Sequence, residues 1–321
     1  MKKIAVVYGG FSAEVEISIK SGKSVAGWLA NAGYDVYEIL LVKEGWFLVR
    51  GEERFPVDKN DFSCTVANEK ITFDKVFIVI HGDPGENGLL QAYFEMLDID
   101  FAGSSSLVTS IAFDKYACKS YLKEKGIALA EDYFIRKGEH YDKDEIIRRL
   151  GLPLFVKPTT SGSSFGVTKV KTPQDFDAAV EFAFSEGPAV LIEKAICGKE
   201  IDCGVYSDSE GIHSLPLIEI VPNGEFFDYE AKYLGASQEI CPARVDMATT
   251  IRVQHQAEKI FEILGCKGLI RFDFIVTPEG TPYFLEANPN PGMTGASLVP
   301  QEVRQAGMTM EDFLTRIIEG D

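Results

Sequence analysis

The sequence predicts an α/β fold that changes to α+β in its C-terminal part. Three stretches support this prediction. An apolar run over residues 3–8 ends in Gly9-Gly10 and leads into a segment with helical period. A Gly/Ser-rich loop near residue 160 separates two extended runs, and a turn, T-P-E-G-T-P, separates two more near residue 280. The first stretch is typical of a parallel α/β unit, and the other two are typical of β-hairpins.

The composition narrows the class of protein. A chain of 321 residues with 45% apolar content can bury a large core and is expected to form two or three domains. Its 32 basic and 49 acidic residues give a net charge of −17, which disfavours binding to nucleic acid or to anionic membranes. No apolar run is long enough for a signal peptide or a membrane span. The 6 cysteines lack metal-binding spacing, so we expect reduced thiols in a cytoplasmic protein.

The first part of the chain alternates strands and helices. We expect strands over residues 3–8, 34–42 and 75–80, with short strands and turns over 45–70, and helices over 13–32 and 89–97. Ligands bind at the carboxyl ends of such strands, where Glu14 lies in the first turn of a helix and His81 lies beside a loop. Both are therefore candidate substrate contacts. The alternatives are that Glu14 complements a helix dipole and that His81 is a structural hydrogen bonder.

The stretch L-P-L-F-V-K-P-T-T-S-G-S-S-F-G-V-T-K-V predicts a hairpin over a phosphate site. An apolar strand ends at Lys157, a Ser/Thr/Gly loop follows, and a strand resumes at Val167. The stretch lacks both the G-K-[ST] of a Walker A loop and the helix after it. Backbone N–H and hydroxyl groups of such a flap can donate to phosphate oxygens. A mobile surface turn is the alternative, but a lysine in an apolar strand must face a partner.

The remaining segments predict a mixed second half. We expect helices over 112–126, 143–150, 172–185, 249–264 and 310–319, and strands over 133–135, 190–194, 201–206 and 213–221. The strand over 190–194 leads into A-I-C-G-K-E, and the backbone of this edge could bind a flat heterocycle. A connector over 226–234, F-F-D-Y-E-A-K-Y-L, is aromatic and charged.

The third stretch, R-F-D-F-I-V-T-P-E-G-T-P-Y-F-L-E-A-N-P-N-P-G, carries a candidate metal site. A strand has a side-chain period of two, so Arg271 and Asp273 share one face of the first run. Glu286 and Asn288 share a face of the second. If the runs pair as a hairpin, the two carboxylates and the amide oxygen converge into a hard ligand set that suits Mg²⁺. The alternative is a solvated strand face with scattered charges.

Five motifs in this order resemble those of the D-alanine–D-alanine ligase family within the ATP-grasp superfamily. They are G-G-x-S-x-E, H-G-x-x-G-E-x-G, K-P-x-x-x-G-S-S-x-G, Y-E-A-K-Y, and R-x-D followed by L-E-A-N-x-x-P-G. The resemblance covers nearly the whole chain and implies a three-domain ATP-grasp architecture with an N-terminal Rossmann-like domain. The implied boundaries are 1–103 for an α/β substrate domain, 104–193 for a central subdomain with the phosphate flap, and 194–321 for a C-terminal subdomain with the Mg²⁺ site.

The resemblance implies an ADP-forming carbon–nitrogen ligase. It would join two D-alanines through an acyl phosphate for peptidoglycan precursor synthesis, with ATP and two Mg²⁺ as cofactors and Mn²⁺ able to substitute. The partners implied are small-molecule substrates and a second copy in a homodimer. The rivals are a D-alanine–D-lactate ligase, another ATP-grasp carboxylate–amine ligase, and a nucleotide-binding regulatory module without turnover.

The resemblance also assigns roles to residues at matching positions. ATP phosphates would contact Lys115 and Lys157, the adenine and ribose would contact Glu193, Lys194, Ile196 and Glu200, and Ser164 would also bind the nucleotide. Mg²⁺ would be held by Asp273, Glu286 and Asn288. The first D-alanine would contact Glu14 and His81, and the second would contact Ser297 and Leu298, with Lys232 as a further substrate contact. The oxyanion hole would be Arg271 and the Gly292 N–H, and a set joining the domains across the closed flap would be Ser163, Tyr233 and Glu14.

Three positions depart from the family pattern. Asn87 stands where an Asp is more usual, residues 83–84 are Asp-Pro, and Pro289 replaces a residue that is often Thr. None of them removes a group that the chemistry requires. The pair Lys232-Tyr233 matches the dipeptide-forming type in this resemblance, which favours an amine nucleophile over D-lactate.

Overall fold

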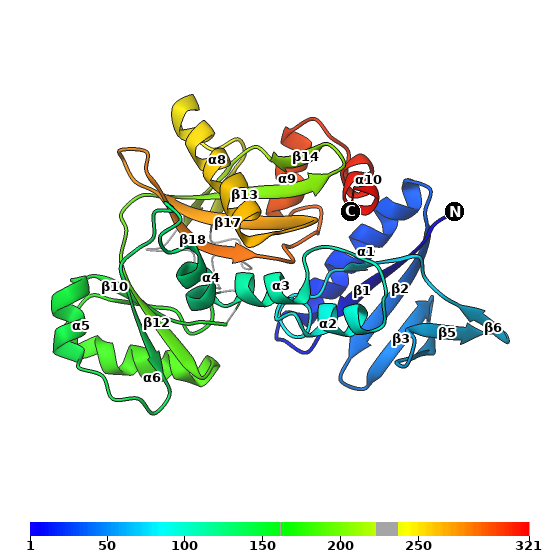
Figure 1. Ribbon diagram of the computed structural model, residues 1–321, viewed down its shortest axis with the longest axis horizontal. Coiled ribbons are helices and arrows are strands. Elements are labelled where there is room, and N and C mark those ends of the chain that lie inside the picture. Colours follow the sequence, from blue (N-terminus) through cyan, green and yellow to red (C-terminus); the bar gives the residue numbers. More distant parts are fainter. Residues whose placement is uncertain (161, 163, 223–236, 321) are drawn as a thin grey trace.

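The chain is built on three β-sheets (Figure 1). The structure is a computed structural model and describes residues 1–160, 162, 164–222 and 237–320. The N-terminal sheet holds β1 (Lys3–Gly9), β2 (Asp35–Val42), β3 (Gly45–Arg50), β4 (Glu53–Asp58), β5 (Ser63–Val66), β6 (Glu69–Ile71), β7 (Lys75–Ile78) and β8 (Phe101–Ala102). The central sheet holds β9 (Asp132–Arg136), β10 (Leu154–Pro158), β11 (Thr168–Val170) and β12 (Ala189–Lys194). The C-terminal sheet holds β13 (Lys199–Asp208), β14 (Gly211–Ser214), β15 (Ile218–Pro222), β16 (Ser237–Ile240), β17 (Leu269–Val276) and β18 (Pro282–Asn288).

The helices lie between and around these sheets. They are α1 (Val15–Asn31), α2 (Leu89–Met96), α3 (Ser106–Phe113), α4 (Lys115–Leu122), α5 (Lys143–Leu150), α6 (Phe176–Glu186), α8 (Met247–Leu264), α9 (Leu298–Gln305) and α10 (Met310–Glu319), with a 3₁₀ turn at Pro173–Asp175. None of the helices in the described part of the chain combines the length and apolar character that crossing a bilayer requires.

The N-terminal sheet has the order β6-β5-β4-β3-β2-β1-β7-β8. Strand β1 pairs in parallel with β2 and β7, and the strands from β2 to β6 form an antiparallel meander. Helix α1 packs closely on β1 because Gly22 has no side chain, and a Cβ there would overlap the Tyr8 ring. The α/β unit predicted from the first strand, the Gly pair and the helix is confirmed.

The central and C-terminal sheets supply the two predicted hairpins. Strands β10 and β11 pair antiparallel with Leu154 opposite Val170, so the Gly/Ser loop connects two paired strands. Strands β17 and β18 pair antiparallel with Asp273 opposite Glu286 and Arg271 opposite Asn288. The register shifts by one residue after Asp273, which leaves Leu285 as a bulge. The predicted pairing of the acidic strands is confirmed.

Two local predictions were wrong, and one helix was missed. The helix expected over 112–126 is two helices, because Asp114 is extended (φ −80°, ψ 109°) and its side chain accepts a hydrogen bond from the Ala117 N–H at 2.8 Å, which starts α4. The strand expected over 213–221 is two strands, β14 and β15. Helix α9 was not predicted.

Helix α10 joins the C-terminal part to the N-terminal sheet. Its apolar face, including Phe313 and Ile317, belongs to the same buried cluster as Ile4 of β1 and Leu29 of α1. Buried Lys75 donates to the Ile318 carbonyl at 3.0 Å, where a helix C-terminus favours a cation. The two parts of the chain therefore share one core.

Candidate active site

A cavity of about 540 Å³ lies between the central and C-terminal sheets. The residues predicted from the sequence to contact ATP all line it, together with one predicted metal ligand: Lys115, Lys157, Ser164, Glu193, Lys194, Ile196, Glu200 and Glu286. They come from α4, β10, the flap, β12, the segment between β12 and β13, β13 and β18. The structure therefore brings together side chains that lie more than 150 residues apart in the sequence.

Three of the charged side chains that line this cavity are buried. Glu193 forms ion pairs with both Lys119 and Lys157, and all three side chains are almost fully buried. Burial lowers the pKa of Lys157 to about 8. Burial alone would raise the pKa of Glu193, but the two ammonium groups lower it to about 2. Lys119 was not singled out from the sequence, although it lies one helical turn after Lys115 on α4 and shares its face.

The acidic hairpin lies beside the cavity. Arg271 forms a bidentate pair with Asp273, with Nε–Oδ1 at 2.7 Å and Nη2–Oδ2 at 2.8 Å. The Asn288 amide donates to Asp273 Oδ2 at 2.9 Å, and Lys115 Nζ lies 3.0 Å from Glu286 Oε2. Two carboxylates facing each other across a hairpin, with an amide next to them, are a donor set that fits Mg²⁺. The predicted convergence of these side chains is confirmed.

The residues predicted to contact the first substrate lie at the N-terminal sheet. His81 is buried, and its Nδ1 lies 2.9 Å from the Asn290 carbonyl, an acceptor, so Nδ1 carries the hydrogen. Its Nε2 lies 3.4 Å from Ser21 Oγ. Burial lowers the pKa of His81. Glu14 lies directly before α1, and Gly162 of the flap approaches it so closely that a Cβ on Gly162 would lie 2.7 Å from Glu14 Oε2.

The residues predicted for the oxyanion and the second substrate lie in the loop after β18. A Cβ on Gly292 would lie 2.9 Å from Ser297 Oγ, so the Gly292 backbone closely approaches Ser297. Ser297 Oγ accepts from the Thr294 N–H at 3.0 Å, and Leu298 begins α9. Three further predicted residues, Ser163, Lys232 and Tyr233, lie outside the described residues.

The departure at Asn87 has a structural use. Its amide donates to Asp83 Oδ1 at 2.6 Å, and its Oδ1 accepts from the Leu89 N–H at 3.2 Å at the start of α2. Asn87 thus closes the loop after β7 locally.

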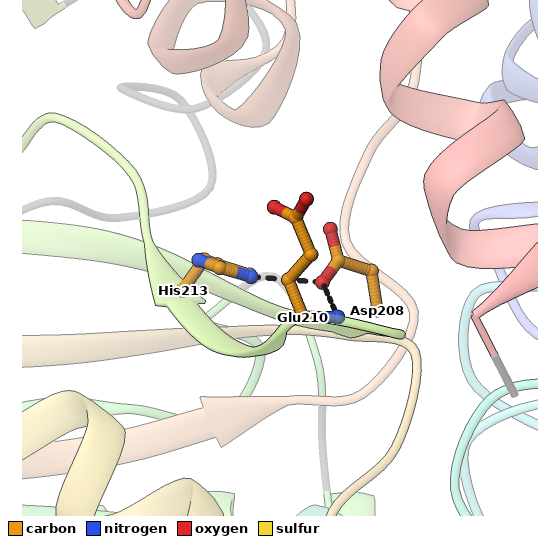
Figure 2. A group of neighbouring side chains, drawn as sticks. All are labelled: Asp208, Glu210 and His213. Atoms are coloured by element: carbon orange, nitrogen blue, oxygen red, sulfur yellow. Dashed lines mark hydrogen bonds and ion pairs between the residues drawn. The ribbon is translucent and has the colours of Figure 1, made fainter.

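A second acidic cluster lies far from the cavity, at the turn between β13 and β14 (Figure 2). Asp208 Oδ1 accepts from His213 Nε2 and from the Glu210 N–H, both at 2.8 Å. Arg316 of α10 lies 3.0 Å from Asp208 and 3.5 Å from Glu210. Because a guanidinium already balances these carboxylates, the cluster links the turn to α10 and is not a candidate metal site.

Glu86 is an unusual buried acid next to the predicted substrate loop. It accepts from the Gly82 N–H at 2.7 Å. Burial, and then the charge of Glu14, raise the pKa of Glu86 from 4.5 to about 8. Between those values the folded protein binds more protons than the unfolded chain, so this contribution to stability is full below pH 4.5 and is lost as pH rises through about 8.

The free energy of unfolding of the wild type should therefore fall as the pH rises from 5 to 8. In Glu86→Gln this fall should be smaller, by up to about 1.4 kcal/mol per pH unit. Unfolding in denaturant at several pH values measures the difference. Glu16→Gln, which changes an exposed acid on α1, is the control and should track the wild type. Parallel pH curves for Glu86→Gln and the wild type would show that Glu86 keeps an ordinary pKa.

Comparisons with known proteins agree with this geometry. The family model described as D-ala D-ala ligase N-terminus matches residues 3–104, and the one described as D-ala D-ala ligase C-terminus matches residues 121–319. The D-alanine–D-alanine ligase of Phocaeicola vulgatus is 44% identical over 99% of this chain and 98% of that protein. The Parabacteroides distasonis protein of the same name is 43% identical over 100% of this chain and 97% of that protein.

Solved structures give the same result. The VanG D-Ala:D-Ser ligase of Enterococcus faecalis superposes with a TM-score of 0.87 at 31% identity, over 99% of this chain and 98% of that one. The Bacillus anthracis D-alanine–D-alanine ligase complexed with ATP superposes with a TM-score of 0.80 at 29% identity, over 100% and 97%. Both halves of the chain and its whole length thus match proteins of one kind, and the chain belongs to the D-alanine–D-alanine ligase family, with the ATP-grasp fold.

Proposed function

We propose that this chain joins two D-alanines into D-alanyl-D-alanine, a peptidoglycan precursor, at the expense of ATP. The observation that carries the proposal is a lysine-lined cavity next to an acidic hairpin, in a chain whose full length matches relatives of that name. The division into domains at 1–103, 104–193 and 194–321 belongs to the proposal; helices α3 and α4 pack with the core of the C-terminal sheet.

The nucleotide lies in the cavity in this proposal. Lys115, Lys157 and Ser164 contact its phosphates, and Glu193, Lys194, Ile196 and Glu200 surround the adenine and ribose. The Glu193 carboxylate is already held by two lysines, so its part in binding the base falls to the backbone. The ammonium groups of Lys115 and Lys157 draw the phosphate oxygens towards the hairpin, where the reaction occurs.

The residues Asp273, Glu286 and Asn288 would hold the divalent cations. Mg²⁺ bound there would neutralise phosphate charge during transfer of the γ-phosphoryl group. The full proposal includes two ions, with Mn²⁺ able to replace Mg²⁺, and a homodimer in the cytoplasm.

The reaction has two steps. An oxygen of the first D-alanine carboxylate, oriented by Glu14 and His81, attacks the γ-phosphorus, and the bond to the ADP oxygen breaks. The amine of the second D-alanine, placed by Ser297 and Leu298, then attacks the acyl carbon and loses a proton, and phosphate leaves. Arg271 and the Gly292 N–H stabilise the oxyanion in between. The flap over 159–166 excludes water, which would otherwise hydrolyse the acyl phosphate.

Release of ADP with D-alanine as the only amino acid tests the proposal. We expect ADP and D-alanyl-D-alanine in equal amounts, and no ADP once EDTA has removed the metal. ADP release that is indifferent to D-alanine would indicate a different acid substrate. No release at all would indicate a binding module without turnover.

The second substrate is tested by competition. D-alanine is offered together with D-lactate or with D-serine near neutral pH, and the products are separated by mass. We expect the D-alanine dipeptide to dominate. A dominant depsipeptide, or a dominant product with D-serine, would correct the assignment of the nucleophile.

A further inference from the structure

Asp202 is a buried acid to which the proposed reaction assigns no role. It lies on β13 directly opposite Asp273 of β17, and its side chain is 1% exposed. Its Oδ2 lies 3.4 Å from Arg271 Nε. Its Oδ1 has no hydrogen-bond partner among the described residues. An unsatisfied buried carboxyl oxygen is costly, so its presence next to Arg271 needs a reason.

The surroundings of Arg271 hold more buried acid than base. The Asp273 carboxylate accepts hydrogen bonds from both Nε and Nη2 of the Arg271 guanidinium. Glu302 of α9 is fully buried, and its two oxygens accept from the Gly204 N–H at 3.2 and 3.1 Å, across the strand from Arg271. Within the described part of the chain, Arg271 is thus the one cation that contacts Asp202 and Asp273. Such an excess of carboxyl groups is suited to further positive charge.

A divalent cation on Asp273 would compete with Arg271 for the same oxygens. Asp273 accepts two bonds from Arg271 and one from Asn288, which occupies most of its acceptor capacity. The positive charges of the cation and the guanidinium also repel each other. The guanidinium therefore needs a second acceptor within reach if it is to stay in the site while the cation binds.

We propose that Asp202 is a positioning residue that takes over the Arg271 guanidinium when a divalent cation occupies Asp273. Its oxygen Oδ1 is the open acceptor, and the existing 3.4 Å approach of Oδ2 means that a small rotation of Arg271 suffices. Arg271 then stays beside the reacting groups, and Asp273 becomes available to the metal. This inference rests on the proposed function, since it uses the metal site on the hairpin.

The test is a double-mutant cycle on metal-dependent nucleotide binding, which needs no turnover. Calorimetry gives the affinity for ADP with EDTA and with Mn²⁺, and the ratio is the metal-dependent gain. In Asp202→Asn the guanidinium stays on Asp273, so the gain should fall about 10-fold. In an Arg271→Leu background the competitor is gone, and Asp202→Asn should leave the gain unchanged.

The controls separate this inference from the proposed function and from a folding defect. Asp208→Asn changes a buried acid on the same strand that faces Arg316, and it should keep the wild-type gain. Far-ultraviolet circular dichroism and thermal melting check each fold. If Arg271→Leu does not fold, Arg271→Gln replaces it, because a neutral amide carries no charge that competes with the cation for Asp273.

The outcomes are distinct. No metal-dependent gain in the wild type would contradict the metal site itself. A wild-type gain that Asp202→Asn leaves intact would contradict the inference alone. An equal loss from Asp202→Asn with and without Arg271 would show that Asp202 acts only through the local structure.

Discussion

Glu286→Ala should lower the kcat for D-alanine-dependent ADP release by on the order of 10³-fold, because a lost metal ligand removes several kcal/mol of charge stabilisation. Glu286 lies opposite Asp273 across the hairpin and lines the cavity, where it contacts Lys115. No other carboxylate of β18 can take its place, since Glu286 is the only acid between Pro282 and Asn288. Steady-state kinetics with a coupled ADP assay measures the loss.

The control for Glu286→Ala is Glu279→Ala. Glu279 is exposed in the turn of the same hairpin, so this variant removes an equal charge from a nearby place without touching the cavity. It should keep wild-type kcat. Near-normal activity of Glu286→Ala would mean that the metal is held elsewhere and that the acidic hairpin has another purpose.

Glu193→Ala should destabilise the protein by about 3–5 kcal/mol, because it leaves two buried ammonium groups without their carboxylate. Glu193 is 3% exposed and pairs with both Lys119 and Lys157. The loss should be largest between pH of about 2 and about 8, where the Glu193 carboxylate is ionised and Lys157 is protonated. Unfolding in urea, followed by circular dichroism, measures it.

Two further variants make this result specific. Glu181→Ala removes an exposed acid from α6, which packs on the same central sheet, and should change stability little. Lys119→Met combined with Glu193→Gln should recover part of the loss, because one of the two uncompensated charges is gone. Equal stability of Glu193→Ala and the wild type would show that the ion-paired arrangement contributes nothing to folding.

The parts of the site that sequence reasoning found are those fixed by short-range geometry. The strand period of two placed Arg271 with Asp273 and Glu286 with Asn288, and the register of β17 and β18 then brought the pairs together. The charge of Lys157 in an apolar strand indicated that this side chain faces a partner, predicted to be a phosphate; in the structure it pairs with Glu193 and lines the cavity. These predictions needed no knowledge of which distant segments meet.

The site residues that sequence reasoning missed make their contacts with distant segments of the chain. Lys119 and Asp202 lie close to other charged residues in the sequence, so neither stood out as Lys157 did. Their partners also lie 74 and 69 residues away in the sequence.

Helix α9 was missed because Pro300 lies near its start, where proline is tolerated but resembles a loop residue. The break at Asp114 depends on a cap of local origin, which was visible as an acid before Lys115 and was not used.

The contribution of α10 to the first core has a consequence for biosynthesis. A ribosome releases β1 and α1 long before residues 310–319, yet Phe313 and Ile317 complete the apolar cluster around Ile4 and Leu29. The nascent N-terminal sheet and α1 must therefore keep an apolar surface exposed until residues 310–319 have been synthesised. Chaperone capture of stalled chains should consequently depend strongly on whether synthesis stops before or after this helix.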